Sequence, residues 1–178
     1  MAATPQAIGR IRFRPEVPED EPFLCALYAS TRTEEMALTG WPEEQKEVFL
    51  RQQFRFQTIH YRRYYSTASF DIILQDERPV GRVYVHRGAG DIRLMDIALL
   101  PEYRGAGIGS WILRNLLAEA AGSQKPVTLH VEPYNPAVCF YHRLGFRVVE
   151  QKGMNLFMEW RMENQRREEV VLGADGHT

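Results

Sequence analysis

Apolar residues follow this chain in short runs that alternate between strand-like and helix-like spacing. Alternating or continuous apolar runs predict seven strands, at residues 8–14, 70–74, 79–86, 94–100, 127–131, 146–150 and 156–160. In the first of these, Ile11 and Phe13 are expected to point inward. Apolar residues spaced three and four apart predict helices after Glu19, over 42–65, and from Ile108 to Ala120. The pattern therefore predicts helices and strands mixed along the whole chain.

The longest predicted helix, residues 42–65, combines an apolar stripe with polar and basic positions. The packing stripe is assigned to Val48, Phe49, Phe56 and Ile59. Gln53 and His60 share the face of Phe49 and Phe56, so they either complete hydrogen bonds in the core or face a polar cleft. For His60 we favour the structural role. The arginines of this helix, mixed with aromatic residues, could contact RNA, but a solvated face is the favoured interpretation.

Length and composition place the chain among ordinary soluble domains. It has 178 residues, 44% hydrophobic and 25% charged, with a formal net charge of −1, which gives no general attraction to nucleic acid. We expect one domain over residues 1–162 and a polar tail over 163–178. Two cysteines and scattered histidines predict neither a disulfide framework nor a metal site. No run is long enough to cross a membrane and no signal peptide is recognised, so a cytoplasmic location is expected.

A glycine-rich loop separates the apolar run 94–100 from the helix that follows it. Pro101 ends the strand, and Arg104-Gly105-Ala106-Gly107-Ile108-Gly109 precedes the helical spacing. Glycines allow positive φ and close approach of a ligand to the backbone. The free N–H groups and the dipole of the helix start favour an anion. The segment therefore predicts a site for a phosphate or pyrophosphate.

Two common phosphate-binding loops fit this spacing poorly. A P-loop requires Lys followed by Ser or Thr after its last glycine, but Ser110-Trp111 follows Gly109. A dinucleotide loop requires GxGxxG, whereas this chain has GxGxG. Glu132 stands near where a ribose-binding acid would lie, but too little chain follows it to complete a doubly wound sheet.

A second pattern lies about one strand downstream of the loop. It reads Asn135-Pro136-Ala137, then Phe140-Tyr141, then Leu144-Gly145-Phe146. The two patterns, in this order, resemble the signatures of the GNAT superfamily of N-acyltransferases. The resemblance implies an α/β (α+β) fold, with a mixed central sheet of about six to seven strands flanked by about four helices. It also implies that the sheet is splayed at its central parallel pair.

The resemblance implies transfer of an acetyl group from acetyl-CoA to a primary amine. It assigns coenzyme binding to Ile97, Ala98, Leu99, Arg104, Gly105, Ala106, Gly107, Ile108, Gly109, Ser110, Asn135 and Tyr141. Tyr141 is also the candidate general acid, because tyrosine, with a reference pKa of about 10, can protonate a thiolate. The alternative is that Tyr141 only packs against Phe140.

The sequence alone does not decide which residue is the general base or which residues bind the acceptor. Asp96 lies inside the apolar strand, where it could accept the amine proton or pair with Arg93 or Arg82 as a structural ion. Acceptor contacts are assigned to Glu34, Glu35, Trp41, Gln53, His60, Tyr84 and Glu132, and the resemblance makes Met36 a further acceptor candidate. The carboxylates among them, together with Asp96, would favour a cationic small-molecule or peptide amine.

A non-catalytic role and assembly into a homodimer are also considered from the sequence. The same fold could bind acyl-CoA without catalysis, as a sensor or scaffold, but Tyr141 together with an intact loop favours an enzyme. No nucleic-acid or membrane partner is expected. The apolar trio at residues 170–172 could add an edge strand to another subunit, which would make a homodimer.

Overall fold

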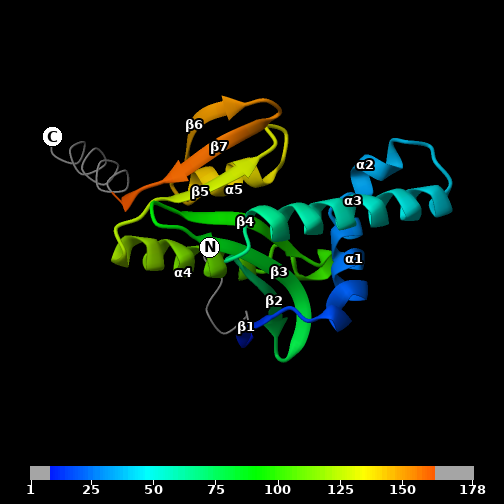
Figure 1. The fold of residues 1–178 in the computed structure, drawn as a ribbon, viewed down its shortest axis with the longest axis horizontal. Helices are drawn as coiled ribbons and strands as arrows, with labels where there is room; N and C mark the ends of the chain where they lie inside the picture. Colours follow the sequence, from blue (N-terminus) through cyan, green and yellow to red (C-terminus); the bar gives the residue numbers. More distant parts are fainter. Residues whose placement is uncertain (1–8, 163–178) are drawn as a thin grey trace, which may run out of the picture. The chain divides into compact units, whose positions relative to one another are not determined.

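The computed structural model describes residues 9–162 of the chain. Within them, seven strands form one sheet in the order β1-β2-β3-β4-β5-β7-β6 (Figure 1). The strands are β1 (Ile11–Pro15), β2 (Ser69–Gln75), β3 (Arg78–Arg87), β4 (Ile92–Leu99), β5 (Val127–Val131), β6 (Arg147–Lys152) and β7 (Asn155–Trp160). The α-helices are α1 (Glu21–Ser30), α2 (Thr33–Ala37), α3 (Glu43–Tyr64), α4 (Ile108–Gly122) and α5 (Ala137–Arg143). Two 3-10 helices are η2 (Pro18–Asp20) and η3 (Pro101–Tyr103).

These elements confirm the expected mixed α/β architecture. Strand β4 pairs with β5 in parallel, through Ile92↔Val127 and Arg93↔Thr128, and β4 itself runs on to Leu99. The other pairings with a described register are antiparallel. The short helix α2 lies between the helix predicted after Glu19 and the one predicted over 42–65, so the described chain has one α-helix more than expected. The expected tail at residues 163–178 lies outside the described residues.

The described chain divides into two compact units. The first holds the residues up to His86 together with Asp96–Gly109, and the second holds Arg87–Met95 and the residues from Ser110 onward. The assignment of residues 1–162 to a single domain therefore stays a prediction.

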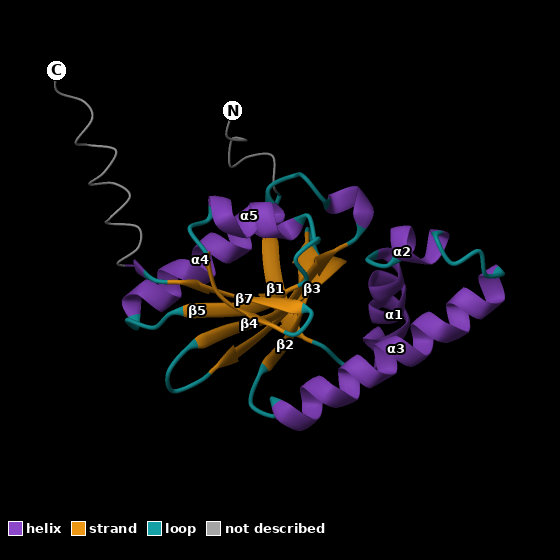
Figure 2. Cartoon of the chain, turned by 90° about the horizontal axis from the view of Figure 1, so that it is seen from above, coloured by secondary structure: helices purple, strands orange, loops and turns teal. Residues whose placement is uncertain are grey.

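The first unit is built on the β2–β3 hairpin and the helices α1, α2 and α3, which lie together in Figure 2. The two central residues of the hairpin turn, Asp76 and Glu77, both have positive φ, as a two-residue type I′ turn requires. The core cluster of this unit comprises Leu24, Tyr28, Met36, Leu50, Phe54, Ile72 and Leu74.

Helix α3 buries a different face from the one predicted. Val48, Phe56 and Ile59 are 54%, 65% and 62% exposed, whereas Leu50 and Phe54 are buried. Apolar residues occur all around this helix, so its own spacing does not decide which face packs. Gln57 and Tyr61 continue the buried row at helical spacing and contact Arg82 and Tyr84 on β3.

The predicted first strand also needs a correction. It begins at Ile11, the predicted start at Ile8 lies outside the described residues, and Phe13 is 45% exposed instead of pointing into the core. Arg14 on this strand forms a two-pronged contact with Asp20, whose carboxylate also accepts the Val17 N–H. The Arg14 hydrogen bonds keep the pKa of the buried Asp20 below its ordinary value. An ion pair therefore fixes the path of the chain from β1 into α1.

Gly81 on β3 allows the close approach of β4. A Cβ added to Gly81 would lie 2.3 Å from the Ala98 carbonyl oxygen and 2.8 Å from the Leu99 side chain. We expect Gly81→Ala to lower the free energy of unfolding by about 1–3 kcal/mol, because backbone atoms must move. Urea unfolding would measure this loss. Gly90→Ala is the matched control, since a Cβ there meets nothing within 4 Å; equal stability losses in the two variants would contradict the prediction.

The second unit contains most of α4 together with α5, β5 and the β6–β7 hairpin, and β5 pairs with β7. Its buried residues include Ile112, Leu113, Leu116, Leu117, Val127, Leu129, Val131, Met158 and Trp160. Trp111, one of the apolar residues at helical spacing in α4, is 40% exposed. Strand β5 has the predicted bounds, and the turn between β6 and β7 contains Gly153 at φ +61.

Candidate functional site

The glycine loop has the backbone conformation that its sequence predicted. It follows β4 and η3, and Gly105 and Gly107 have φ values of +74 and +92. A Cβ at Gly105 would meet nothing within 4 Å, so that position requires glycine for its conformation rather than for space. Helix α4 begins at Ile108, and no acidic residue lies in its first turn. The first-turn N–H groups and the helix dipole therefore meet no local negative charge, as an anion site requires.

The side chain of Arg104 folds back onto the first unit. Its Nε donates a hydrogen bond to the Leu99 carbonyl at 2.9 Å. Its Nη2 donates to Ser30 at the end of α1, with 3.2 Å to Oγ and 3.4 Å to the carbonyl oxygen. The first residue of the loop is thus tied to the ends of both β4 and α1. Sequence reasoning placed Arg104 in the site but missed Ser30.

In the second unit, α5 carries the tyrosine assigned as the proton donor. Tyr141 is buried, and its ring lies 5.6 Å from the Phe140 ring and 5.7 Å from the Phe146 ring. Asn135 Oδ1 accepts a hydrogen bond from the Ala137 N–H at 2.9 Å, and so helps to start the helix. The expected packing with Phe140 is present, and the acid role of Tyr141 stays a prediction.

Asp96 on β4 pairs with Arg82 on β3, which is one of the two partners considered from the sequence. Arg82 Nη2 lies 2.5 Å from Asp96 Oδ2, and the Arg82 side chain is only 3% exposed. Arg82 also donates to Gln57 Oε1 at 2.7 Å, and its guanidinium lies 4.9 Å from the Tyr84 ring centre. Burial acts to lower the pKa of Arg82, but the charge of Asp96, its hydrogen bond and the nearby Tyr84 and Tyr61 together outweigh burial and leave this pKa raised. The other candidate, Arg93, instead contacts Asp91 and Thr128.

The predicted acceptor residues of the first unit contact different neighbours. Tyr84 is buried, donates its hydroxyl to Glu16 at 2.7 Å, and has a pKa raised chiefly by burial. Trp41 packs edge-on against Phe49, and Glu35 pairs with Arg32.

The remaining acceptor candidates are more open. His60 is exposed beside the rings of Tyr61 and Tyr64, Gln53 is half-buried, and Glu34 is exposed. Glu132 is exposed directly after β5 in the second unit. Because Asp96 and Glu35 are each paired with an arginine, the charge of these two carboxylates is balanced within the first unit.

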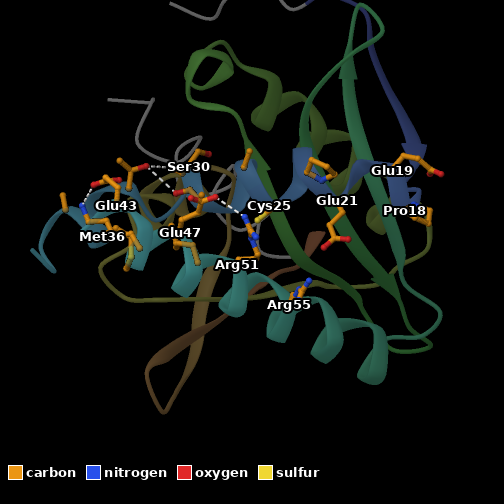
Figure 3. Close-up of a pocket in the computed structure, with 17 residues that line it drawn as sticks. Pro18, Glu19, Glu21, Cys25, Ser30, Met36, Glu43, Glu47, Arg51 and Arg55 are labelled. Atoms are coloured by element: carbon orange, nitrogen blue, oxygen red, sulfur yellow. Dashed lines mark hydrogen bonds and ion pairs between the residues drawn. The ribbon is translucent and has the colours of Figure 1, made fainter. Parts of the chain in front are cut away.

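A cleft of about 1330 Å³ lies in the first unit between α1, α2 and α3 (Figure 3). Its lining includes Cys25, Ser30 and Met36 from α1 and α2, with Leu50 and Arg55 from α3. The sequence interpretation did not identify this cleft, and of the acceptor candidates only Met36 is among its lining residues. Two amphipathic helices in sequence indicate a packed pair but do not show where their surfaces separate.

Neither a metal site nor a membrane-spanning helix is present in the described part of the chain. Residues 9–162 contain no group of three or more His, Cys, Asp or Glu side chains placed to hold a metal ion. None of the helices in this range has the length and apolar character needed to cross a bilayer.

Comparison with known protein families identifies the family that this loop resembles. Residues 66–148, which run from the β2–β3 hairpin to the start of β6, match the family described as Acetyltransferase (GNAT) domain. Residues 66–148 therefore resemble a GNAT domain. The assignment confirms the family expected from the glycine loop and the Asn135–Phe146 pattern. It supports acyl transfer as the general reaction.

Solved structures show the same GNAT fold over most of the chain. The PaiA N-acetyltransferase of Thermoplasma acidophilum, solved in complex with coenzyme A, has a TM-score of 0.65 and 22% identity; the match covers 85% of this chain and 99% of that one. An acetyltransferase from Thermus thermophilus has a TM-score of 0.61 and 22% identity, over 86% and 97% of the two chains.

A sequence relative covers only a short segment. The cysteine-rich protein 2-binding proteins of mouse and human are 42% identical to this chain over 50 residues. That segment is 28% of this chain and 6% of the relatives, so this protein matches only a small part of their length.

Proposed function

We propose that this GNAT protein is an N-acetyltransferase that moves an acetyl group from acetyl-CoA to a primary amine by direct attack. The observation that carries the proposal is the glycine loop, whose positive φ values at Gly105 and Gly107 lead into an α4 start without acidic residues. Such a loop suits the pyrophosphate of a coenzyme. The PaiA structure contains coenzyme A, which supports the same choice here.

Different residues are proposed to bind different parts of coenzyme A. The backbone N–H groups from Arg104 to Ser110 would hold the pyrophosphate, and Asn135 would start the helix that carries Tyr141. Strand β4 continues past its parallel register with β5, so the main chain of Ile97, Ala98 and Leu99 is proposed to bind the pantetheine arm and the acyl oxygen. When bound, acetyl-CoA supplies an activated thioester.

Two side chains are proposed to handle protons. Tyr141 would donate its hydroxyl proton to the leaving sulfur, which makes the thiol a better leaving group. Asp96 would take the proton of the attacking amine, directly or through water, while Arg82 holds the carboxylate in place. The acceptor is proposed to be a small-molecule or peptide primary amine.

Turnover with a panel of amines tests this function. Purified protein and acetyl-CoA are incubated with cationic, neutral and acidic amines, and release of free thiol is measured. Thiol release that depends on an amine is the expected result. Tight binding of acetyl-CoA with no turnover for any amine would instead support a non-catalytic acyl-CoA sensor. A cytoplasmic location, the lack of a nucleic-acid partner and a homodimeric assembly stay predictions from the sequence.

Replacing Gly107 by valine should disable the coenzyme loop without unfolding the protein. Gly107 has φ +92, which a β-branched residue adopts only with strain. We expect the affinity for acetyl-CoA to fall more than about tenfold, since the loop must change its backbone conformation. Calorimetric titration measures the affinity, and circular dichroism checks the fold.

Gly90→Val is the control for this loop variant. Gly90 has no positive φ, and a Cβ there would meet nothing within 4 Å. Undiminished affinity in Gly107→Val, or an equal loss in both variants, would remove the loop from coenzyme binding.

A further inference from the structure

The Arg104 side chain is held by oxygen atoms of the protein itself, without a phosphate ligand. Its Nε and Nη2 form one edge of the guanidinium, and that edge already donates to Leu99 and Ser30. This is an edge with which arginine can make a two-pronged contact to phosphate or carboxylate. Because protein oxygens hold it, Arg104 is oriented toward the ends of β4 and α1.

Ser30 provides a suitable anchor for this cation. It is the last residue of α1, where helix carbonyls lack partners and the dipole is negative. Its hydroxyl donates to the Leu27 carbonyl at 2.7 Å, so the oxygen is held in place while it accepts from Arg104. One serine thus presents both a carbonyl and a hydroxyl oxygen to the guanidinium.

We propose that Arg104 is a positioning residue, and that Ser30 is its anchor on α1. The anchor fixes the backbone between Leu99 and Gly105, which is the segment that leads from the central strand into the coenzyme loop. The expected effect of the anchor on coenzyme affinity rests on the proposed function. Its expected effect on the loop backbone does not rest on that function, because the contact between Arg104 and Ser30 exists in the free protein.

A double-substitution cycle separates anchoring from direct phosphate binding. Ser30→Ala, Arg104→Gln and the double variant are compared with the wild type for the dissociation constant of coenzyme A, by calorimetry. We expect each single change to weaken binding about 2–10-fold, and the double variant to be no weaker than Arg104→Gln. Independent, multiplying losses would overturn the anchor, as would a Ser30→Ala variant that binds normally.

Two conservative variants distinguish further between an anchoring role of Arg104 and direct phosphate binding. Ser30→Thr keeps the hydroxyl and should restore affinity. Arg104→Lys keeps the charge but loses the planar edge, so it should bind as weakly as Arg104→Gln. Lysine restoring most of the affinity would show that Arg104 acts as a phosphate-binding charge instead.

Hydrogen exchange tests the anchor without any ligand. In the free protein, Ser30→Ala and Arg104→Gln should each raise deuterium uptake in the peptide containing residues 100–109, and the double variant should add nothing further. Ser123→Ala is the matched control, because Ser123 lies at the end of α4 and its hydroxyl bonds only helix carbonyls there. Unchanged uptake in both single variants would refute the anchor. A wild type that fails to bind coenzyme A would refute the proposed function alone.

Discussion

Tyr141→Phe is expected to lower kcat by about 10²–10⁴-fold and to leave the affinity for acetyl-CoA nearly unchanged. The hydroxyl is proposed to give a proton to the leaving sulfur, an interaction made only as the thioester breaks. Phenylalanine keeps the aromatic contacts with Phe140 and Phe146, so the fold should persist. Single-turnover kinetics would measure the chemical step, and calorimetry the affinity.

A neighbouring tyrosine provides the control for this variant. Tyr134 is 98% exposed, so Tyr134→Phe removes a hydroxyl close in sequence without touching buried packing. It should retain the wild-type rate. If Tyr141→Phe keeps more than about half of the wild-type rate with chemistry limiting, then Tyr141 is not the acid. The role of Tyr141 would then be to pack against the rings of Phe140 and Phe146.

Arg82→Met is expected to lower the free energy of unfolding by about 3–5 kcal/mol. Arg82 is the buried cation that balances Asp96, and its removal leaves a largely buried carboxylate without its partner. The same change removes the hydrogen bond from Arg82 to Gln57, which joins β3 to α3. Denaturant unfolding at neutral pH measures the loss.

Two comparisons show whether the buried charge is responsible. Arg82→Met combined with Asp96→Leu should recover much of the stability, because no unpaired charge remains. Arg87→Met breaks a pair with Glu119 whose side chains are 48% and 40% exposed, and should cost less than about 1 kcal/mol. A double variant as unstable as Arg82→Met alone would show that lost packing, not charge, explains the effect.

The elements of this fold were largely predictable where their signals are local. Pro101 and the glycines between Arg104 and Gly109 end one element and begin the next within a few residues, so the loop followed from the sequence. Strand β5 was also found, because its apolar residues Val127, Leu129 and Val131 alternate with polar ones. The turn at Gly153 was recognised from the glycine between two apolar segments.

Features that depend on distant residues were not decided by the sequence. Val48 and Leu50 are both apolar, but Leu50 is buried in a cluster with residues of α1, α2 and β2, whereas Val48 is exposed. The choice between Arg82 and Arg93 as partner of Asp96 depends on the packing of β3 against β4. Ser30 gives no sequence signal of its contact with Arg104, because a serine at a helix end is commonplace and its partner lies far along the chain.

The pairing of β1 with β2 has a consequence for how the protein folds. Ile11 pairs with Gln75, so β1 can join the sheet only after the chain between them, including α1, α2 and α3, has been brought together. The hairpins β2–β3 and β6–β7 close over short turns, and hairpins of this kind form in about 1–10 μs. Contacts between residues far apart in sequence slow folding, because loop-closure entropy is lost before those contacts form. Refolding should therefore begin at the two hairpins, and β1 should be among the last strands to gain protection.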